Sequence, residues 1–482
     1  MWKWVSLACA VILLFTAGTG FILYTLAKNI VTSDGTRVSV HERIIQSAVG
    51  NMMSFLPLLP EFLGYTKPHT YLFLFANNTE LRPSGGFIGS YAVVHIDKGK
   101  IDLRVLEGSE VLDKTTPDAW RPQPPEPLTD HLGVDKWYFR DSNWSPDFPT
   151  SAEQALTLYA GEQGVDAKEI DMVVVFTVSV LEALMRVIGP VEIQGLRLEA
   201  DTIVSELQYA TGYDYSIRGY SQENRKGILK NIFVAIMQKA KDELPENYGT
   251  YISLFKRLVD ERHIAIYARD ETIQTKIDAL GWAGRVKNSG EGDYALWVDA
   301  NLASLKTDHA IERTLEYHIE PRADGRYVAT ASMRYVHTGM FDWRTTRYRT
   351  YARLFVPKGS ELLSSDGSMK WDRSTEPGVV YHGEELGRQW FGTFIAIEPG
   401  RTGTLTFTYL LPLSVSQMIE HGTYTLFVQK QLGTIQNRLT LNLDFGTLIH
   451  TALPAEESTK QGDSVYQQES DLRVDREFSV TF

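Results

Sequence analysis

The hydrophobic pattern of this 482-residue chain changes at Asp308, and this change limits the folds that the chain can adopt. Between Thr70 and Asp299, short apolar runs alternate with longer segments in which apolar residues recur every three to four positions. Such strand–helix alternation is typical of an α/β layer. After Asp308 the helical pattern disappears, and short alternating runs are separated by Gly, Pro and Asp clusters. The sequence therefore predicts an α/β domain followed by a C-terminal all-β sandwich.

An uncharged apolar run of 24 residues extends from Trp4 to Ala27. As a helix it would be about 36 Å long, enough to cross a bilayer core of about 30 Å. The run predicts one N-terminal transmembrane helix, a single-pass location in the plasma membrane, and an extracytoplasmic position for the bulk of the chain. A signal peptide cleaved near Ala17 and Gly18 is the alternative. Continuation of the apolar stretch to Tyr24 favours an uncleaved signal anchor.

These patterns divide the chain into four expected segments. They are a signal anchor over 1–30, a juxtamembrane helix over 31–68, the α/β domain over 69–305 and the β-sandwich domain over 306–482.

Charge and cysteine content exclude several classes of function. The net charge of −12 argues against a nucleic-acid partner, because neutralising phosphates requires a basic face. Cys9, the only cysteine, lies in the apolar run, so the remainder forms no internal disulfide, cysteine-ligated metal site or thiol nucleophile. The chain also lacks the G-x-S-x-G, G-x-x-x-x-G-K-[ST], G-x-G-x-x-G and H-E-x-x-H motifs.

Polar residues follow the first predicted strand directly, at the position where α/β proteins bind ligands. Arg82 is suited to hold a phosphate, and Gly85 and Gly86 allow backbone amides to point into a cavity. Asn78 and Glu80 lie beside them and complete a candidate ligand-binding loop. The structural alternative is a tight connection in which Arg82 pairs with Glu80 or another buried acid.

A second polar segment precedes a predicted helix. Asp141, Asn143 and Asp147 offer the oxygen ligands that magnesium accepts, and Asp141 and Asp147 are the candidate metal ligands. Trp144 could stack on a sugar. The structural alternative is an Asx-turn fixed by buried aromatic residues.

A third candidate site is the basic start of a later predicted helix, which contains Arg218 and Arg225. Unpaired amides and the helix dipole attract anions at such a position. The structural alternative is a solvated first turn.

The first two motifs resemble a known family. Asn77–Tyr91 and Asp141–Pro149 look like signatures of the domain of unknown function 4012, and Gly281–Gly284 and Trp297–Asn301 look like its later landmarks. The resemblance extends from about residue 70 to the C-terminus. The family is bacterial, membrane-anchored and uncharacterised, with no established activity, so the resemblance implies a cell-envelope location without a reaction.

A more distant resemblance is to the LytR-CpsA-Psr family. These anchored extracytoplasmic enzymes transfer glycopolymers from a polyprenyl-pyrophosphate lipid to peptidoglycan, with Mg2+. By position, Arg82 resembles the family's first phosphate-binding arginine and Arg225 the late one. Glu107 stands where the family has another such arginine, and Lys226 and Gly227 replace its Gln-Gln pair. The resemblance therefore implies a shared sheet more strongly than a shared reaction.

Two functions follow from these observations. The first is an envelope protein that binds or transfers a polyprenyl-pyrophosphate-linked glycan to the cell wall, with Arg82, Arg225 and Asp141 as catalytic residues. The alternative is a non-catalytic cell-surface scaffold or adhesion module that acts through the β-sandwich. Glu107 favours the alternative, and the sequence leaves open whether the chain is an enzyme.

Overall fold

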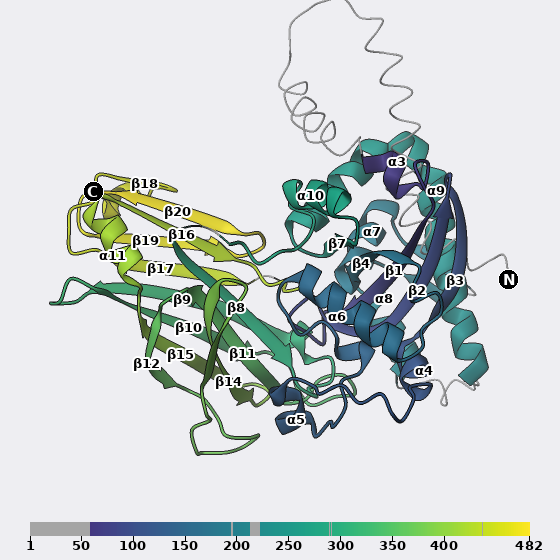
Figure 1. Ribbon diagram of the computed structural model, residues 1–482, viewed down its shortest axis with the longest axis horizontal. Helices are drawn as coiled ribbons and strands as arrows, with labels where there is room; N and C mark the ends of the chain where they lie inside the picture. Colours follow the sequence, from purple (N-terminus) through teal and green to yellow (C-terminus); the bar gives the residue numbers. More distant parts are fainter. Residues whose placement is uncertain (1–57, 194–195, 213–221, 289, 291, 436) are drawn as a thin grey trace, which may run out of the picture. The chain divides into compact units, whose positions relative to one another are not determined.

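The computed structural model describes residues 58–482 apart from 194–195, 213–221, 289, 291 and 436. The chain divides into two compact units, each assembled from separate segments (Figure 1). The first unit comprises the described part of Met1–Ala76, with Ile88–Trp120 and Ala152–Gly284. The second comprises Asn77–Phe87, Arg121–Ser151 and Arg285–Phe482.

The first unit is built on a five-stranded sheet with the strand order β3-β2-β1-β4-β7, and β5 and β6 form a separate pair. The strands are β1 (His69–Asn77), β2 (Phe87–Asp97), β3 (Lys100–Gly108), β4 (Ile170–Thr177), β5 (Val191–Ile193), β6 (Leu196–Leu198) and β7 (Ile264–Ala268). The helices are α3 (Leu59–Phe62), α4 (Ser109–Lys114), α6 (Phe148–Gly161), α7 (Val178–Ile188), α8 (Ile203–Gly212), α9 (Gln222–Asp260) and α10 (Glu271–Ala279). The division between the units falls within α6, and the backbone of α9 leaves the helical conformation at Asn247.

Apolar patterning explains the core of this unit. Strand β1 is buried almost throughout, and Phe73 lies beside Val174 of β4 in parallel register. In α7, Val180, Leu184 and Ile188 recur at helical spacing and are buried in the same core. The strand–helix alternation that the sequence predicts is therefore present in this unit.

The second unit contains two large sheets (Figure 1). The six-stranded sheet has the order β12-β15-β10-β9-β17-β19, and the seven-stranded sheet β13-β14-β11-β8-β16-β20-β18. The strands are β8 (Asp293–Asn301), β9 (Ile311–Pro321), β10 (Tyr327–His337), β11 (Tyr348–Pro357), β12 (Glu361–Asp366), β13 (Tyr381–Glu385), β14 (Arg388–Ile397), β15 (Thr402–Leu410), β16 (Thr423–Gln429), β17 (Arg438–Asp444), β18 (Thr451–Leu453), β19 (Val465–Asp471) and β20 (Arg476–Thr481). The helices are α5 (Glu126–Leu132), η2 (Phe139–Asp141), η3 (Thr307–Ala310), α11 (Leu413–Glu420) and η4 (Ser458–Lys460).

Alternate residues of these strands form the sandwich core. On β9, Leu315, Tyr317 and Ile319 are buried, whereas the residues between them are partly exposed. They join Trp297 of β8 and Phe407 of β15 in one apolar cluster. Period-two burial of this kind is expected where two sheets pack face to face.

The predicted fold class is wrong. The described part of the chain is predominantly β, with four sheets. The sheet of the first unit is mixed: β1 and β4 are parallel, whereas β2–β3 and β4–β7 are antiparallel. Strand β8, expected to close an α/β domain ending at 305, instead lies inside the seven-stranded sheet of the second unit. It is buried on both faces, and such a strand carries no periodicity that assigns it to a sheet.

The expected transmembrane helix is not supported by the structure. No helix in the described part of the chain is both long enough and apolar enough to cross a membrane. The run from Trp4 to Ala27 and most of the expected juxtamembrane helix lie outside the described residues.

A carboxyl group is buried between the two large sheets. Asp293, at the start of β8, accepts hydrogen bonds from the hydroxyl groups of Tyr424 at 2.6 Å and Tyr317 at 2.7 Å. Burial raises the pKa of Asp293 to about 6, although these hydrogen bonds oppose the increase. The folded state therefore binds this proton more tightly than the unfolded state does, and its stabilising contribution is lost as the pH rises through 6.

We expect Asp293→Asn to remove this pH dependence. Relative to the wild type, the variant should gain about 3 kcal/mol in free energy of unfolding between roughly pH 4 and pH 7, because it carries no buried charge. Urea denaturation of both proteins across this range measures the difference. Parallel stability profiles for the two proteins would contradict the assignment.

Candidate functional site

The segment Asn77–Phe87 is a loop closed by its own backbone. The side chain of Asn77 accepts a hydrogen bond from the Thr79 hydroxyl at 2.8 Å, and the Phe87 amide donates to the Glu80 carbonyl at 2.8 Å. A Cβ atom on Gly86 would lie 2.4 Å from the Asn77 carbonyl oxygen, so the closed loop requires glycine at that position. The glycine thus serves backbone packing.

Arg82, the leading predicted phosphate ligand, is directed at protein acceptors. Its Nε donates to Asp141 Oδ1 at 3.1 Å, and Nη2 lies 3.8 Å from Glu80 Oε1. Its Nη1 donates to the carbonyl oxygens of Leu81 and Asn301. Only 4% of the Arg82 side chain and 11% of the Asp141 side chain are exposed. This arrangement corresponds to the structural alternative, in which Arg82 pairs with Glu80 or another buried acid.

Other predicted ligand-binding residues join the same loop to the sandwich. The Asn143 side-chain amide donates to the Gly86 carbonyl at 2.7 Å, and the Asn78 amide donates to the Gly433 carbonyl at 2.7 Å. A Cβ atom on Gly433 would lie 2.1 Å from the Gly85 carbonyl oxygen, so these two backbones touch. Asn78, Gly85, Gly86 and Asn143 are therefore brought together with Arg82.

Asp147 and Trp144 have structural contacts of their own. Asp147 Oδ2 accepts from the amide and hydroxyl of Thr150 in the first turn of α6, and Oδ1 accepts from the Val286 amide at 2.9 Å. The Trp144 carbonyl accepts from Arg353 Nη2 at 2.6 Å, and the guanidinium lies 5.3 Å from the indole centre. Asp147 thus acts as a helix cap.

A second buried ion-pair cluster centres on Arg313 of β9. Its Nε donates to Asp299 Oδ2 at 2.8 Å, and Nη2 donates to Asp308 and to the Tyr348 hydroxyl. The Tyr335 hydroxyl donates to the other oxygen of Asp299 at 2.7 Å. The side chains of the arginine and both acids are at most 3% exposed.

The two clusters form one continuous network. Asp308 Oδ2 accepts from the Leu81 amide at 3.0 Å and from the Asn301 side chain at 2.8 Å. Asn301 is also the residue whose carbonyl accepts from Arg82. Gln431 Nε2 donates to the Arg82 carbonyl at 3.1 Å. We call these connected residues the buried network; its members are Glu80, Arg82, Asp141, Asp299, Asn301, Asp308, Arg313 and Gln431.

Burial controls ionisation in the buried network. It raises the pKa of Glu80, although the positive charges of Arg82 and Lys306 oppose the increase. Burial alone would lower the pKa of Arg313, but Tyr348 and the surrounding acids outweigh it and raise that pKa well above the usual range. The guanidinium therefore remains charged.

Four connections at one end of the sandwich lie next to the buried network. They link β8–β9, β10–β11, β12–β13 and β14–β15, and we call them the end loops: residues 302–310, 338–347, 367–380 and 398–401. Strand register places them at the same end. The pairs are Asn301 with Thr350, Ile311 with His337, Tyr348 with Ile397, Val336 with Thr402 and Asp366 with Thr406. Asp308 of the buried network belongs to the first of these loops.

Polar contacts hold the end loops against one another. The Lys306 amide donates to the Arg344 carbonyl at 2.8 Å. Arg347 donates to Asp372 at 2.9 Å and to Glu398 at 2.6 Å, so three of the four loops share one guanidinium. The end loops therefore present a single, fixed surface.

Apolar side chains protrude from this surface. Met340 is 80% exposed, Phe341 62%, Trp371 51% and Val379 64%. Leu305 is also exposed, and its backbone has a positive φ of 52°, a conformation that a leucine rarely adopts. Exposed apolar groups in a strained loop cost stability and are typical of binding surfaces.

The structure does not place the predicted basic helix start with the buried network. Arg218 lies outside the described residues, and so does the side chain of Arg225, whose backbone belongs to α9 in the first unit. The described residues contain no group of three or more His, Cys, Asp or Glu side chains suited to hold a metal. The magnesium site at Asp141 and Asp147 therefore stays a prediction.

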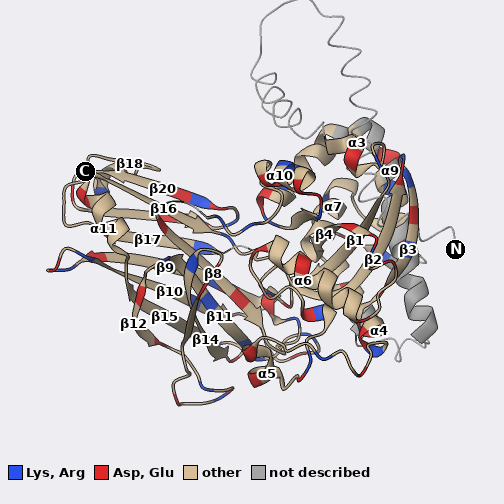
Figure 2. Cartoon of the chain, in the orientation of Figure 1, with Lys and Arg blue, Asp and Glu red and all other residues tan. Residues whose placement is uncertain are grey.

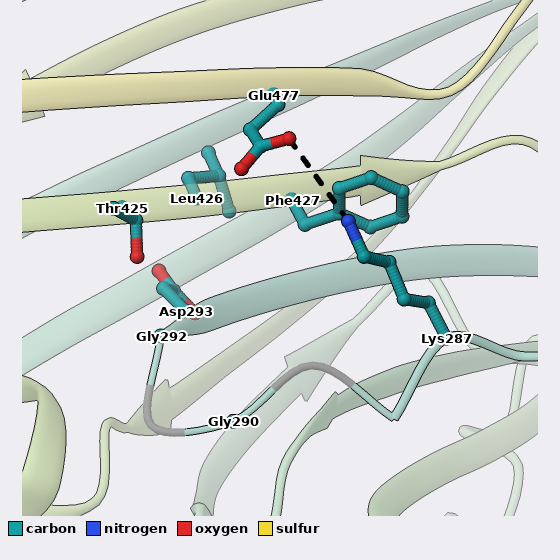
Figure 3. A pocket seen from close by; sticks show the side chains of 8 residues that line it. All are labelled: Lys287, Gly290, Gly292, Asp293, Thr425, Leu426, Phe427 and Glu477. Carbon is teal, nitrogen blue, oxygen red and sulfur yellow. Dashed lines mark ion pairs between the residues drawn. The ribbon is translucent and has the colours of Figure 1, made fainter.

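A small pocket of about 230 Å³ lies at the start of β8 (Figure 3). Lys287 Nζ lies 3.8 Å above the Phe427 ring and 4.0 Å from Glu477 Oε2, so its charge is already engaged. Asp293, which also lines the pocket, is held by the tyrosine hydroxyls. The charged groups that line the pocket thus already have protein partners, and we assign the pocket no ligand.

Residues 66–211 match the family model described as a protein of unknown function (DUF4012). The match agrees with the DUF4012 resemblance expected from the sequence signatures. The DUF4012 region includes both signature segments, whereas the expected later landmarks at 281–284 and 297–301 lie beyond it. The signature residues Arg82 and Asp141 thus contribute to the buried network.

Other comparisons add little. No curated protein matches the chain. A putative nutrient binding protein from Legionella pneumophila is 8% identical, with 39% of this chain and 71% of that chain covered and a TM-score of 0.26. A transcriptional regulator from Bacillus subtilis is 12% identical, with 44% of this chain and 76% of that chain covered and a TM-score of 0.22. A zinc metallopeptidase from Deinococcus radiodurans is 11% identical, with 36% of this chain and 42% of that chain covered and a TM-score of 0.17. These scores are too low to support an argument about fold or function, so the LytR-CpsA-Psr resemblance stays a prediction.

The Arg313 cluster was not predicted from the sequence. Arg313 occupies an inward position of β9, in step with the buried Leu315 and Tyr317. An arginine at an inward position of an alternating strand indicates a buried ion pair. The charged residues next to Arg313 obscured the apolar alternation by which the strand is recognised.

We expect Arg82→Met and Asp141→Asn each to lower the free energy of unfolding by about 3–5 kcal/mol, because each removes one partner of a buried ion pair. The double variant should lose less than the sum, since neither charge remains. Denaturant titration of all four proteins completes the cycle.

Arg322→Met is the matched control for this cycle. Arg322 pairs with Asp324 at 3.5 Å, but its side chain is 44% exposed, so its loss should cost at most about 1 kcal/mol. Equal effects of Arg82→Met and Arg322→Met would contradict a structural role for Arg82.

Proposed function

We propose that this protein is a non-catalytic recognition module that acts through the end loops of its β-sandwich. One observation carries the proposal: exposed apolar side chains are gathered on loops that hydrogen bonds and ion pairs fix to one another. Met340 and Phe341 come from one loop, and Trp371 and Val379 from another. Loops on a rigid scaffold are common binding elements because little conformational entropy is lost on binding.

The engagement of the signature residues supports this proposal. All three nitrogen atoms of the Arg82 guanidinium face protein oxygens, and Asp141 is its closest acid. Binding a phosphate at Arg82 would require a buried ion pair to separate, which is costly. The same residues, through Asn301 and Asp308, fix the first end loop. Their arrangement suits positioning of that loop.

Transfer of a polyprenyl-pyrophosphate-linked glycan stays a prediction, since Arg218 and the side chain of Arg225 lie outside the described residues. The extracytoplasmic location, the glycan or peptidoglycan partner and the exclusion of nucleic acid also stay predictions. Basic and acidic residues are interspersed over both units (Figure 2).

Radical footprinting of the full-length chain in intact source cells tests the proposal. We expect labelling of Met340, Phe341 and Trp371 to fall several-fold relative to the purified protein, because a partner covers them in the cell. Leu413 and Leu448, exposed at other places in the second unit, should be labelled equally in both samples.

A matched pair of variants completes this test. Protection of Met340 should disappear in Phe341→Ser/Trp371→Ser and persist in Leu413→Ser/Leu448→Ser. All four substitutions replace exposed side chains, so unfolding stability should change little. Labelling of Met340 that is as strong in cells as in purified protein would reject the proposed function.

A further inference from the structure

We infer that the partner of the end loops is the surface of a lipid bilayer that contains anionic lipids. The inference rests on the proposed function, because it assigns the chemistry of the partner at the same surface. Three properties of the end loops carry it: the protrusion of their apolar side chains, their balance of charge and the pairing of aromatic with basic residues.

Protruding side chains fit a fluid surface. Met340, Phe341 and Val379 are all more than 60% exposed, and they come from two different loops. A protein partner would have to match the shape of all these side chains at once. A bilayer accommodates all of them, since lipid headgroups move aside and apolar side chains enter the acyl boundary.

The charge of the end loops is opposite to that of the whole chain. The loops carry six Lys or Arg residues and five Asp or Glu residues, and one of those acids, Asp308, is buried with Arg313. The chain as a whole has a net charge of −12. Among the described residues, Lys306, Arg344 and Arg373 form no ion pair, so these cations are available to anionic headgroups.

Trp371 combines the two properties. Its ring is half exposed, and the ammonium group of Lys370, which is paired with Glu376 at 2.8 Å, lies 4.5 Å from the ring centre. Tryptophan is typical of the bilayer interface, where its ring meets the acyl boundary and its polar edge faces the headgroups.

A site-specific label tests the inference whether or not other parts of the chain bind lipid. In a full-length Cys9→Ser background, an environment-sensitive dye is attached at Val379→Cys or, as a control, at Leu448→Cys. The probes are phosphatidylcholine vesicles with and without phosphatidylglycerol, each with brominated acyl chains that quench an inserted dye. We expect quenching at position 379 in the anionic vesicles, little in phosphatidylcholine alone, and none at position 448.

Charge variants test the basic residues. Lys306→Gln/Arg344→Gln/Arg373→Gln should lower the ratio of inserted to free loops about 100-fold, as expected for the loss of three cations near an anionic surface. Arg322→Gln/Lys358→Gln/Lys460→Gln removes the same charge outside the end loops and should leave quenching unchanged.

Three results would overturn the inference: no quenching at 379 in either vesicle, equal quenching at 379 and 448, or equal effects of the two charge variants. Loss of quenching together with persistent footprinting protection of Met340 in cells would reject the lipid partner and keep the proposed function. Loss of both signals would reject both.

Discussion

The ion pair between Arg82 and Asp141 is the interaction on which the second unit depends. It joins a loop that follows β1 to a segment 59 residues later, and the same guanidinium reaches the end of β8. Buried ion pairs add little net stability compared with apolar packing, but a lone partner is strongly destabilising. The pair therefore favours the one arrangement in which all three segments meet.

The buried network also explains how an unfavourable loop conformation persists. Ala303 and Leu305 both have positive φ angles, which cost energy for residues with a side chain. Asp308, a few residues later, is anchored by Arg313, the Leu81 amide and Asn301. Anchoring of this kind offsets the strain and keeps Leu305 at the surface. The exposure of Leu305 thus depends on the buried hydrogen bonds and ion pair of Asp308.

Local features were predictable from the sequence, whereas the assembly of segments was not. The strand–helix alternation expected between Thr70 and Asp299 is present as β1, β4 and α7. Asp270 caps α10, where its side chain accepts from the Ile273 amide at 3.1 Å. The predicted fold class was wrong because β8 is buried at every position, so its sequence pattern does not indicate which sheet it joins. The polar segment Pro454–Asp471 contains β19, which pairs with β17 through its backbone and has no apolar pattern that would mark it as a strand.

The candidate site shows the same limit. An ion pair of Arg82 with Glu80 or another buried acid was one of two alternatives that the sequence left open, and Asp141 was not singled out as that acid. The contact between Leu81 and Asp308 spans 227 residues and leaves no local pattern in the sequence. Hydrogen bonds of this kind depend on strand order, which hydrophobic periodicity does not specify.

Glu80 links the signature loop to the exposed surface electrostatically. Burial raises its pKa, and two cations oppose this: Arg82 within the buried network and Lys306 on an end loop. The two guanidinium groups of the network face four carboxyl groups, so acids outnumber cations and the charge of Lys306 matters. Any partner that neutralises Lys306 removes part of the attraction that opposes the rise in the pKa of Glu80. The signature loop and the end loops are therefore coupled electrostatically through Glu80 and Lys306, in addition to the hydrogen bond between Leu81 and Asp308.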